Sequence, residues 1–371
     1  MKELKSASIN LFQLSESQKK HLINCLRFSP TGDNSQHWKF SFKDCYLQVF
    51  LDEERGKHQL NIFNSASYLA LGCLIETANV WAAINSFNVH YDWPEKAKFP
   101  LLLNLSFSTA NTSSIFEEVD LYNRHTNRRH YSTSKLPENR LTQLKEINSD
   151  LNVEIHWKLK PSKKLKDLFQ LGEYFIWKNR KAFMDTTDWV RFKPSESIQT
   201  RDGFSLENLN LSKIDGFFLR VIRTSHFMQK LIWFLGARIK IGFDTFRFKK
   251  HLGAVLAVST QLKGPNALLE SGRAIMRSWL YLNKNQISVH PLTVISLLPY
   301  IYIEYGAWPD GTPNEYADQI ESSYEAWYEK FEIPSEHKIT WAIRFGYAKP
   351  LQDAARTLRR QGEDFMLNKK N

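Results

Sequence analysis

Apolar and polar positions follow two different periods in the first part of the chain. Across residues 15–25 the apolar residues recur at helical spacing, and Ser15 followed by Gln18 is typical of a helix start with a capping box. Aromatic and polar residues then alternate over residues 36–51, which predicts a β-hairpin. A long apolar run at residues 64–85 is rich in small side chains and predicts a helix buried on most of its sides.

The same mixture of periods continues beyond the hairpin and restarts after a polar linker at residues 108–114. Helices and strands alternate without βαβ regularity, and no G-x-G-x-x-G or P-loop motif is present, so an α+β fold is predicted. In chain order, the further predicted elements are strands at 89–93 and 101–107, a short helix from 116, a helix at 137–147, a strand at 153–158, a helical stretch at 165–184, an irregular stretch at 189–215, an amphipathic basic segment at 217–250, a strand at 254–262, a helix at 267–283 and a strand at 338–346.

Composition narrows the class of protein. The 371 residues are 42% hydrophobic and 13% aromatic, which is enough for a large buried core. The sequence has no N-terminal signal pattern and no run of about 18 apolar residues, so we expect a cytoplasmic protein without stable membrane insertion. The three cysteines show no C-x-x-C spacing, so neither a disulfide framework nor a metal site is predicted.

The positive charge is concentrated in a few places. A formal net charge of +11 and a pI near 9.3 favour an anionic partner, which could be a phosphorylated cofactor, a membrane surface or nucleic acid. Within residues 220–250 only Asp244 opposes the cations, and a second group of Arg356, Arg359 and Arg360 lies near the C-terminus. No helix-turn-helix, zinc-finger or RNP-like motif is present, so no nucleic-acid partner is predicted.

Residues 29–38, the first loop, connect the first predicted helix to the hairpin. The side chains of Asn34 and Gln36 each offer a donor and an acceptor, and the backbone N–H groups near Thr31 and Gly32 can reach acceptors on a flat polar ring. The alternative is an ordinary turn stabilised by the side chains of Asp33 and Asn34.

Residues 124–130, the basic loop, contain three arginines and a threonine ahead of a helix. Forked guanidinium donors and a short hydroxyl are the groups that bind phosphate. The alternatives are a solvated basic turn or a nucleic-acid patch.

These segments resemble the FMN-dependent nitroreductases. Residues 29–40 (S-P-T-G-D-N-S-Q-H-W-K-F) resemble that family's S-P-S-S-x-N-S-Q-P-W-x-F loop with His37 in place of the usual proline, and residues 124–128 (R-H-T-N-R) resemble its R-H-S-x-K/R phosphate loop. Residues 272–292 and 344–347, with the terminal arginines, resemble later segments of a diverged branch. That branch includes domains fused to ThiF-type adenylating domains and the mycobacterial Acg-type proteins, so the resemblance implies a possible ThiF/E1-like partner.

The order of the two loops is reversed relative to that family, in which the phosphate loop comes first. The first half of the chain carries only the first loop and the second half only the basic loop, whereas a family homodimer builds each FMN site from both loops. The resemblance therefore implies an intramolecular pseudo-dimer of two half-domains, with a central mixed or antiparallel sheet flanked by helices. The halves are residues 1–110 and residues 115–371, the second containing a lid-like insertion at 190–250 and the C-terminal basic segment.

The resemblance also implies where FMN binds. The phosphate is expected at the basic loop and the terminal arginines, and the isoalloxazine ring at the first loop. The implied cofactor-binding residues are Pro30, Thr31, Gly32, Asn34, Gln36, Arg124, His125, Thr126, Arg128, Arg359 and Arg360. The cofactor carries the redox chemistry, so no catalytic acid or base is required.

Three functions remain open at the level of sequence. The first is an FMN-dependent oxidoreductase that reduces an electron-poor small molecule with NADH or NADPH. The second is a protein that binds or sequesters FMN without turnover, and the third is a basic nucleic-acid-binding protein. Residues 217–250 could form a lid over the flavin or a helix on a membrane surface. The sequence does not choose between a monomer and a homodimer.

Overall fold

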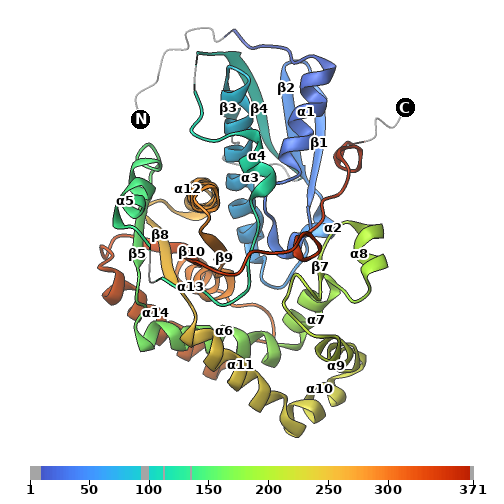
Figure 1. Ribbon diagram of the computed structural model, residues 1–371, viewed down its shortest axis with the longest axis vertical. Helices are drawn as coiled ribbons and strands as arrows, with labels where there is room; N and C mark the ends of the chain where they lie inside the picture. Colours follow the sequence, from blue (N-terminus) through green and yellow to red (C-terminus); the bar gives the residue numbers. More distant parts are fainter. Residues whose placement is uncertain (1–9, 93–99, 112, 134–135, 368–371) are drawn as a thin grey trace.

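The structure is a computed structural model that describes residues 10–92, 100–111, 113–133 and 136–367. The first half begins with the capping box predicted at Ser15 and folds into helices and one antiparallel sheet (Figure 1). Its elements are α1 (Glu16–Leu26), the 3₁₀ turn η1 (Gly32–Asn34), β1 (Trp38–Lys43), β2 (Tyr46–Leu51), α2 (Glu53–Gly56), η2 (Ile62–Asn64), α3 (Ser65–Ile84), β3 (Phe87–Asp92) and β4 (Leu101–Thr109).

The second half repeats this pattern with a long connection of residues 159–253 between its first two strands. Its framework is α4 (Glu118–Asn123), α5 (Glu138–Glu146), β5 (Glu154–Lys158), β8 (Ala254–Thr260), α12 (Gly264–Lys284), β9 (Ser288–Pro291), α13 (Thr293–Tyr305), α14 (Asn314–Phe331), β10 (Lys338–Gly346), η4 (Asp353–Ala355) and η5 (Gly362–Phe365). The connection contains α6 (Lys163–Lys178), α7 (Arg180–Asp188), β6 (Val190–Arg191), α8 (Pro194–Thr200), β7 (Phe204–Ser205), α9 (Lys213–Thr224), α10 (His226–Ile232), η3 (Trp233–Ala237) and α11 (Arg238–Lys250).

The two four-stranded sheets have the same topology. The strand order is β1-β2-β4-β3 in the first sheet and β5-β8-β10-β9 in the second, and every neighbouring pair is antiparallel. In both sheets the second and third strands along the chain are joined through a long buried helix, α3 or α12. Each half therefore repeats one helix–strand–strand–helix–strand–strand unit.

The helices α3 and α12 cross at the centre of the molecule, where backbone meets backbone (Figure 1). A Cβ atom placed on Gly72 would lie 2.1 Å from the carbonyl oxygen of Leu269, and one placed on Gly272 would lie 2.1 Å from that of Leu69. The two contacts are reciprocal, as in a two-fold helix pair. Only glycine permits this approach, because any side chain would collide with the opposite helix backbone.

Several predicted elements are confirmed, and the α+β class is confirmed as well. The helix from Ser15, the hairpin, the buried helix α3 and the strand β10 lie where the periodicity places them. The predicted strand at 89–93 begins earlier, at Phe87, and its last residue lies outside the described residues. The strands form two four-stranded antiparallel sheets, one in each half, and a two-stranded parallel sheet of β6 and β7 in the long connection.

Other parts differ from the prediction. The helical stretch at 165–184 is two helices, because Asn179 has extended backbone angles and caps α7 through its side chain. The stretch expected to be irregular contains β6, α8 and β7, and α12 begins at Gly264 because Pro265 fits the first turn of a helix. The strand β9 and the helices α13 and α14 were not predicted at all.

Within the described residues, one segment is long and apolar enough to span a bilayer, Ile62–Ile84, and 83% of its most apolar window is buried inside the protein. This segment contains α3, which is the core helix that contacts α12. The C-terminal segment returns to the first half, where the Leu367 N–H donates to the carbonyl of Phe40 at 2.8 Å beside β1 (Figure 1).

Candidate functional site

One cavity lies between the two halves and encloses about 900 Å³ out to its open mouth. The first half contributes the first loop and one face of α3, and the second half contributes the basic loop, α12, β9, β10 and the C-terminal segment. The long connection adds Phe204 of β7.

The first loop has an unusual backbone. Asp33, Asn34 and Gln36 all have positive φ angles of 51–54°, a region that costs non-glycine residues free energy. The Thr31 Oγ1 atom accepts a hydrogen bond from the Gln36 N–H at 2.9 Å, which closes the turn. Because such conformations persist only where surrounding contacts enforce them, the loop must be held from outside.

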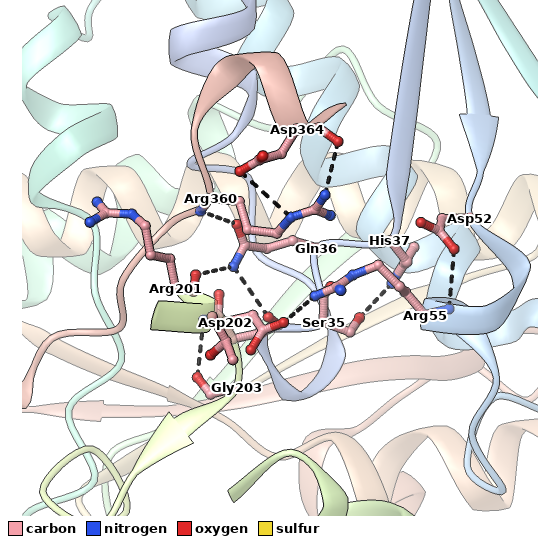
Figure 2. A network of polar contacts seen from close by, with 12 residues as sticks. Ser35, Gln36, His37, Asp52, Arg55, Arg201, Asp202, Gly203, Arg360 and Asp364 are labelled. Atoms are coloured by element: carbon pink, nitrogen blue, oxygen red, sulfur yellow. Dashed lines mark hydrogen bonds and ion pairs between the residues drawn. The ribbon is translucent and has the colours of Figure 1, made fainter. Parts of the chain in front are cut away.

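The outside support for the first loop comes from the long connection and the C-terminal segment, and Figure 2 shows the network. The Asn34 side-chain amide donates to the carbonyls of Gly203 at 3.0 Å and Leu358 at 3.1 Å. The Gln36 amide donates to the Arg201 carbonyl at 2.9 Å, and its oxygen accepts from the Arg360 N–H at 2.9 Å. The two carboxamides therefore bind protein backbone.

Asp202 joins the same network through its carboxylate, which lies only 7% exposed (Figure 2). It pairs with Arg55 of α2 and with Arg191 of β6, the latter at 2.6 Å. Burial acts to raise the pKa of Asp202, but the hydrogen bonds from Arg55 and Arg191 outweigh it and hold the pKa below its usual value. The long connection is thus clamped onto the first half by an ion-pair cluster.

Three arginines face the cavity, and none of them lies within 4.0 Å of a carboxylate oxygen of any described residue. Arg124 is 5% exposed and stacks on Trp279 with 4.4 Å to the ring centroid, and its Nε has no partner in the part of the chain that the structure describes. Burial lowers its pKa to about 10. Its guanidinium still carries a charge at neutral pH, and that charge is uncompensated.

The other two arginines, Arg128 and Arg359, also line the cavity. Arg128 stacks on Phe204 at 4.5 Å, and burial lowers its pKa to about 10. Arg359 is 9% exposed and donates to Asn34 Oδ1 at 2.6 Å, while its Nε has no hydrogen-bond partner among the described residues. Burial, with the nearby charges of Arg124 and Arg27, lowers its pKa to about 9. Buried cations without counter-charges are costly, so an anionic ligand would relieve the penalty.

Arg344 and His290 form a further pair beside the cavity. Arg344 is fully buried between the rings of Tyr131 and Phe248, each 4.2 Å from its guanidinium carbon, and donates through Nε to His290 Nδ1 at 2.9 Å. Burial, followed by the charges of Arg344 and Arg128, holds the pKa of His290 well below its usual value. His290 is therefore neutral with its proton on Nε2, and the ring lines the cavity.

The remaining walls of the cavity are mostly apolar. One side is the face of α3 that carries small side chains, and the other carries indole and phenyl rings. The apolar lining residues are Ala66, Leu69, Ala70, Trp279, Trp341, Phe204 and Pro291. Apolar walls together with three arginines suit a ligand that has both an aromatic ring and an anionic group.

Most of the predicted cofactor-binding residues come together around this cavity. Gln36 and Arg360 do not line it: Gln36 is 1% exposed and bound to backbone, and the Arg360 guanidinium donates to the Asp364 carbonyl at 2.8 Å. Their role in flavin binding stays a prediction, as does that of the others. The predicted residues that line the cavity are Pro30, Thr31, Gly32, Asn34, Arg124, His125, Thr126, Arg128 and Arg359.

Sequence reasoning assigned no role to His290, Arg344 or Phe204. Arg344 stood within a motif noted for its resemblance, but its partner His290 lies on the neighbouring strand β9, which was not predicted. Phe204 lies in the stretch expected to be irregular. Only the fold places these residues beside the two loops.

His21, Cys25 and Glu118 form a cluster of the residue types that bind metals, between α1 and α4. The indole N–H of Trp81 donates to His21 Nδ1 at 3.2 Å, so the neutral ring carries its proton on Nε2, which lies 2.8 Å from Glu118. Burial also raises the pKa of Cys25 to about 11, which disfavours the thiolate. The geometry favours a hydrogen-bond network over a metal site.

Comparison with known proteins identifies only remote likenesses. No protein-family model matches the chain, and no curated protein matches it. An FMN-bound nitroreductase from Bacteroides fragilis is 12% identical, and the match covers 65% of this chain and 97% of that chain with a TM-score of 0.31. A variant of NfnB, an FMN- and NADPH-dependent nitroreductase from a Sphingopyxis strain, is 11% identical with 68% and 98% coverage and a TM-score of 0.35.

Proposed function

We propose that this chain binds FMN in the cavity between its halves and acts as an NAD(P)H-dependent oxidoreductase of the nitroreductase type. The observation that carries the proposal is the meeting of the first loop and the basic loop at one cavity that holds three arginines without carboxylate partners. The two loops are 90 residues apart in the sequence, and each resembles one half of the flavin site of that family.

The residues present fit the cofactor. The Nε atoms of Arg124 and Arg359 are donors without acceptors among the residues that the structure describes, and a phosphate would supply both charge and lone pairs. Thr126 adds a hydroxyl at the same cavity. The apolar walls suit the ring system, so we assign the phosphate to the arginines and the ring to the apolar wall beside α3.

Bound FMN would supply hydride transfer, and the chain's own residues would set its surroundings. The backbone of Pro30, Thr31 and Gly32 presents polar groups at the edge of the cavity, and their strained loop is held rigidly by the Asn34 and Gln36 amides. His290 presents an Nε2 proton beside the cavity because Arg344 occupies its other nitrogen. A neutral donor at this position stabilises negative charge without a change of protonation.

We further infer that one chain forms an intramolecular pseudo-dimer with a single flavin site, divided as residues 1–110 and 115–371. The repeated strand order and the reciprocal Gly72 and Gly272 contacts support this division. The adenylating-domain partner, the cytoplasmic location and the choice between NADH and NADPH stay predictions.

A second candidate function is flavin binding without turnover. Residues 201–204 of the long connection are bound to the first loop, and Phe204 lies over Arg128 at the cavity. A segment held this firmly would restrict the access of a second substrate to the ring.

The test is flavin binding by the purified full-length protein, followed by anaerobic addition of NADPH and then NADH. We expect stoichiometric FMN binding and bleaching of the oxidised-flavin absorption bands. Replacing Arg359 by Met should weaken FMN binding by about 30-fold or more, which corresponds to about 2 kcal/mol for one charged hydrogen-bonding group.

The matched control is Arg129→Met, because Arg129 belongs to the same loop but does not line the cavity. Absence of FMN binding by the wild-type protein, or equal losses in both variants, would overturn the proposal. Flavin that binds and stays oxidised with both nucleotides would leave the second candidate function.

A further inference from the structure

The distal part of the long connection, residues 213–250, forms a lobe of α9, α10, η3 and α11 at the bottom of Figure 1. Nine lysines and arginines and two aspartates lie in this lobe, and the difference of seven is most of the chain's net charge of +11. The lobe is thus much more basic than the rest of the molecule.

One apolar stripe of the lobe faces solvent on α9. Ile214, Phe217 and Phe218 are 69%, 62% and 46% exposed, and they occupy positions i, i+3 and i+4 of the helix. Gly216 and Ile222 lie on its buried side. A helix in a soluble protein normally buries its apolar stripe, so this one lacks a partner among the described residues.

A second apolar group lies where α10 passes into α11. Phe227, Phe234, Leu235 and Ile239 are 70–74% exposed. Gly236 has a φ of 138° within η3, a conformation that favours glycine, and it bends the chain directly after Phe234 and Leu235.

The tip at η3 is held from inside the protein. The Trp233 ring contacts those of Tyr174 and Trp177, with centroids 5.8 and 6.0 Å apart. In α10 the polar Gln229 is buried and donates to the Trp177 carbonyl at 2.7 Å, whereas the apolar Phe227 is exposed. In α10 the polar side chain is therefore buried and the apolar one is exposed, which indicates that the solvent-facing side of this helix makes an apolar contact.

Cations surround these apolar side chains. Lys213, Arg220 and Lys230 are exposed and form no ion pair with any part of the chain that the structure describes. Lys240 pairs with Asp215 at 3.1 Å, which links α11 to α9, and with Asp244 at 2.6 Å within α11. Both acidic side chains of the lobe are therefore paired with the same lysine.

We propose that the lobe binds the surface of a membrane that contains anionic lipids, with Phe234 and Leu235 entering the interfacial layer. Exposed aromatic and aliphatic side chains among lysines and arginines are the chemistry that such a surface recognises. The proposal concerns the surface only, and it is independent of flavin binding in the cavity.

Charge distinguishes this partner from the alternatives. A second copy of the chain joined through the same face would bring two lobes with a net charge of +7 each together, which is unfavourable. A nucleic acid would match the cations, but its phosphate backbone offers nothing to four aliphatic or aromatic side chains exposed by 70% or more.

The test is co-sedimentation of the full-length protein with vesicles of phosphatidylcholine, with and without phosphatidylserine. We expect binding to the phosphatidylserine vesicles, weaker binding at high salt, and at least about tenfold weaker partition to pure phosphatidylcholine. Replacing Phe234 and Leu235 together by Ser should weaken binding to the anionic vesicles by at least about tenfold, because it removes two inserted apolar side chains.

The matched control is Ile115→Ser with Val119→Ser, two exposed apolar side chains outside the lobe, which should bind as the wild type does. A second variant, Lys213→Glu with Lys230→Glu, should lose the preference for phosphatidylserine while remaining folded, since both side chains are exposed. Failure of the wild type to bind anionic vesicles, equal loss in the control, or a dimer that the Phe234 and Leu235 variant disrupts would each overturn the proposal.

Discussion

The two halves of the molecule share one strand order but differ in the length of two connections. One carries α13 and α14 between β9 and β10, and the other bears on the candidate site. In the first half a tight turn joins β1 to β2, whereas in the second half residues 159–253 separate β5 from β8. The added residues reach across to the first half, where Arg201, Asp202 and Gly203 hold the first loop. The connection between β5 and β8 thus makes the repeated framework asymmetric at the candidate site, because it supplies residues that hold the first loop.

The largest expected effect concerns the crossing of α3 and α12, to which each half contributes one helix. Gly72→Ala and Gly272→Ala should each destabilise the protein by about 3 kcal/mol or more, because each new Cβ would collide with a backbone carbonyl that cannot move aside. The two costs should be similar, since the contacts are reciprocal. Chemical denaturation of both variants measures this.

Gly242→Ala, in α11, is the control for these variants, because the only atom among the described residues that its Cβ would meet is the Tyr174 hydroxyl, at 3.9 Å. We expect no loss, or a gain of about 0.5–1 kcal/mol from helix propensity. If Gly72→Ala unfolds at the same denaturant concentration as the wild type, the close crossing of α3 and α12 is wrong.

The next prediction concerns the clamp, the ion-pair cluster of Asp202 with Arg55 and Arg191 that holds the long connection against the first half. Asp202→Asn should cost about 3 kcal/mol, because it leaves the guanidinium groups of Arg55 and Arg191 without their shared counter-charge. The lowered pKa of Asp202 means that its stabilisation is present above the usual carboxyl pKa and is lost as the pH falls through the folded-state value. The difference between variant and wild type should therefore shrink in acid.

Denaturation curves of the wild type and the Asp202→Asn variant give the loss of stability at neutral pH, and curves at the lowest pH at which both fold show whether that loss decreases. Asp310→Asn serves for comparison, since Asp310 is 75% exposed and pairs with an exposed lysine, and it should change stability by less than about 0.5 kcal/mol. Equal effects at the two positions would mean that the clamp contributes no more than a surface ion pair.

Local sequence signals predicted the shared framework well. Ser15 and Gln18 cap α1 through contacts within one turn, and the hairpin and α3 follow from periods of two and 3.6 residues. α13 was missed: it is apolar on most sides and carries Pro299 in its interior, so no clear period appears there.

The candidate site was predicted in its composition but not in its arrangement. Both loops could be identified because phosphate-binding and turn-forming residues gather within a few positions. The clamp and the Arg344 and His290 pair could not, because their members come from different strands or from a stretch without a period. Asn34 and Gln36 also show that a polar side chain in a loop can be committed to neighbouring backbone, which only the fold reveals.

A third and smaller effect has the opposite sign. Arg344→Met should stabilise the ligand-free protein by about 1–2 kcal/mol, because it removes a buried cation whose Nη1 and Nη2 atoms have no partner among the described residues. Thermal and denaturant unfolding without added ligand measure the change. A loss of stability instead would mean that the contacts with the Tyr131 and Phe248 rings and the bond to His290 outweigh the cost of burying the cation.

The smallest effect tests the first loop alone. Burial, and then the charge of Arg55, lower the pKa of His37 to about 3. Its Nδ1 forms a hydrogen bond with Ser35 Oγ at 2.8 Å, and its Nε2 has no partner within the described ranges. Between that value and the usual pKa near 6.5 the unfolded chain binds the proton and the folded chain does not, so His37 destabilises the protein as the pH falls through this window. His37→Phe keeps a ring and removes the titration, so the wild type should lose about 1.2 kcal/mol more than the variant between pH 6 and pH 5. Because only this difference in slope is compared, the lost Ser35 contact does not affect the result, and parallel pH profiles would show that His37 is hydrated or protonated in the folded state.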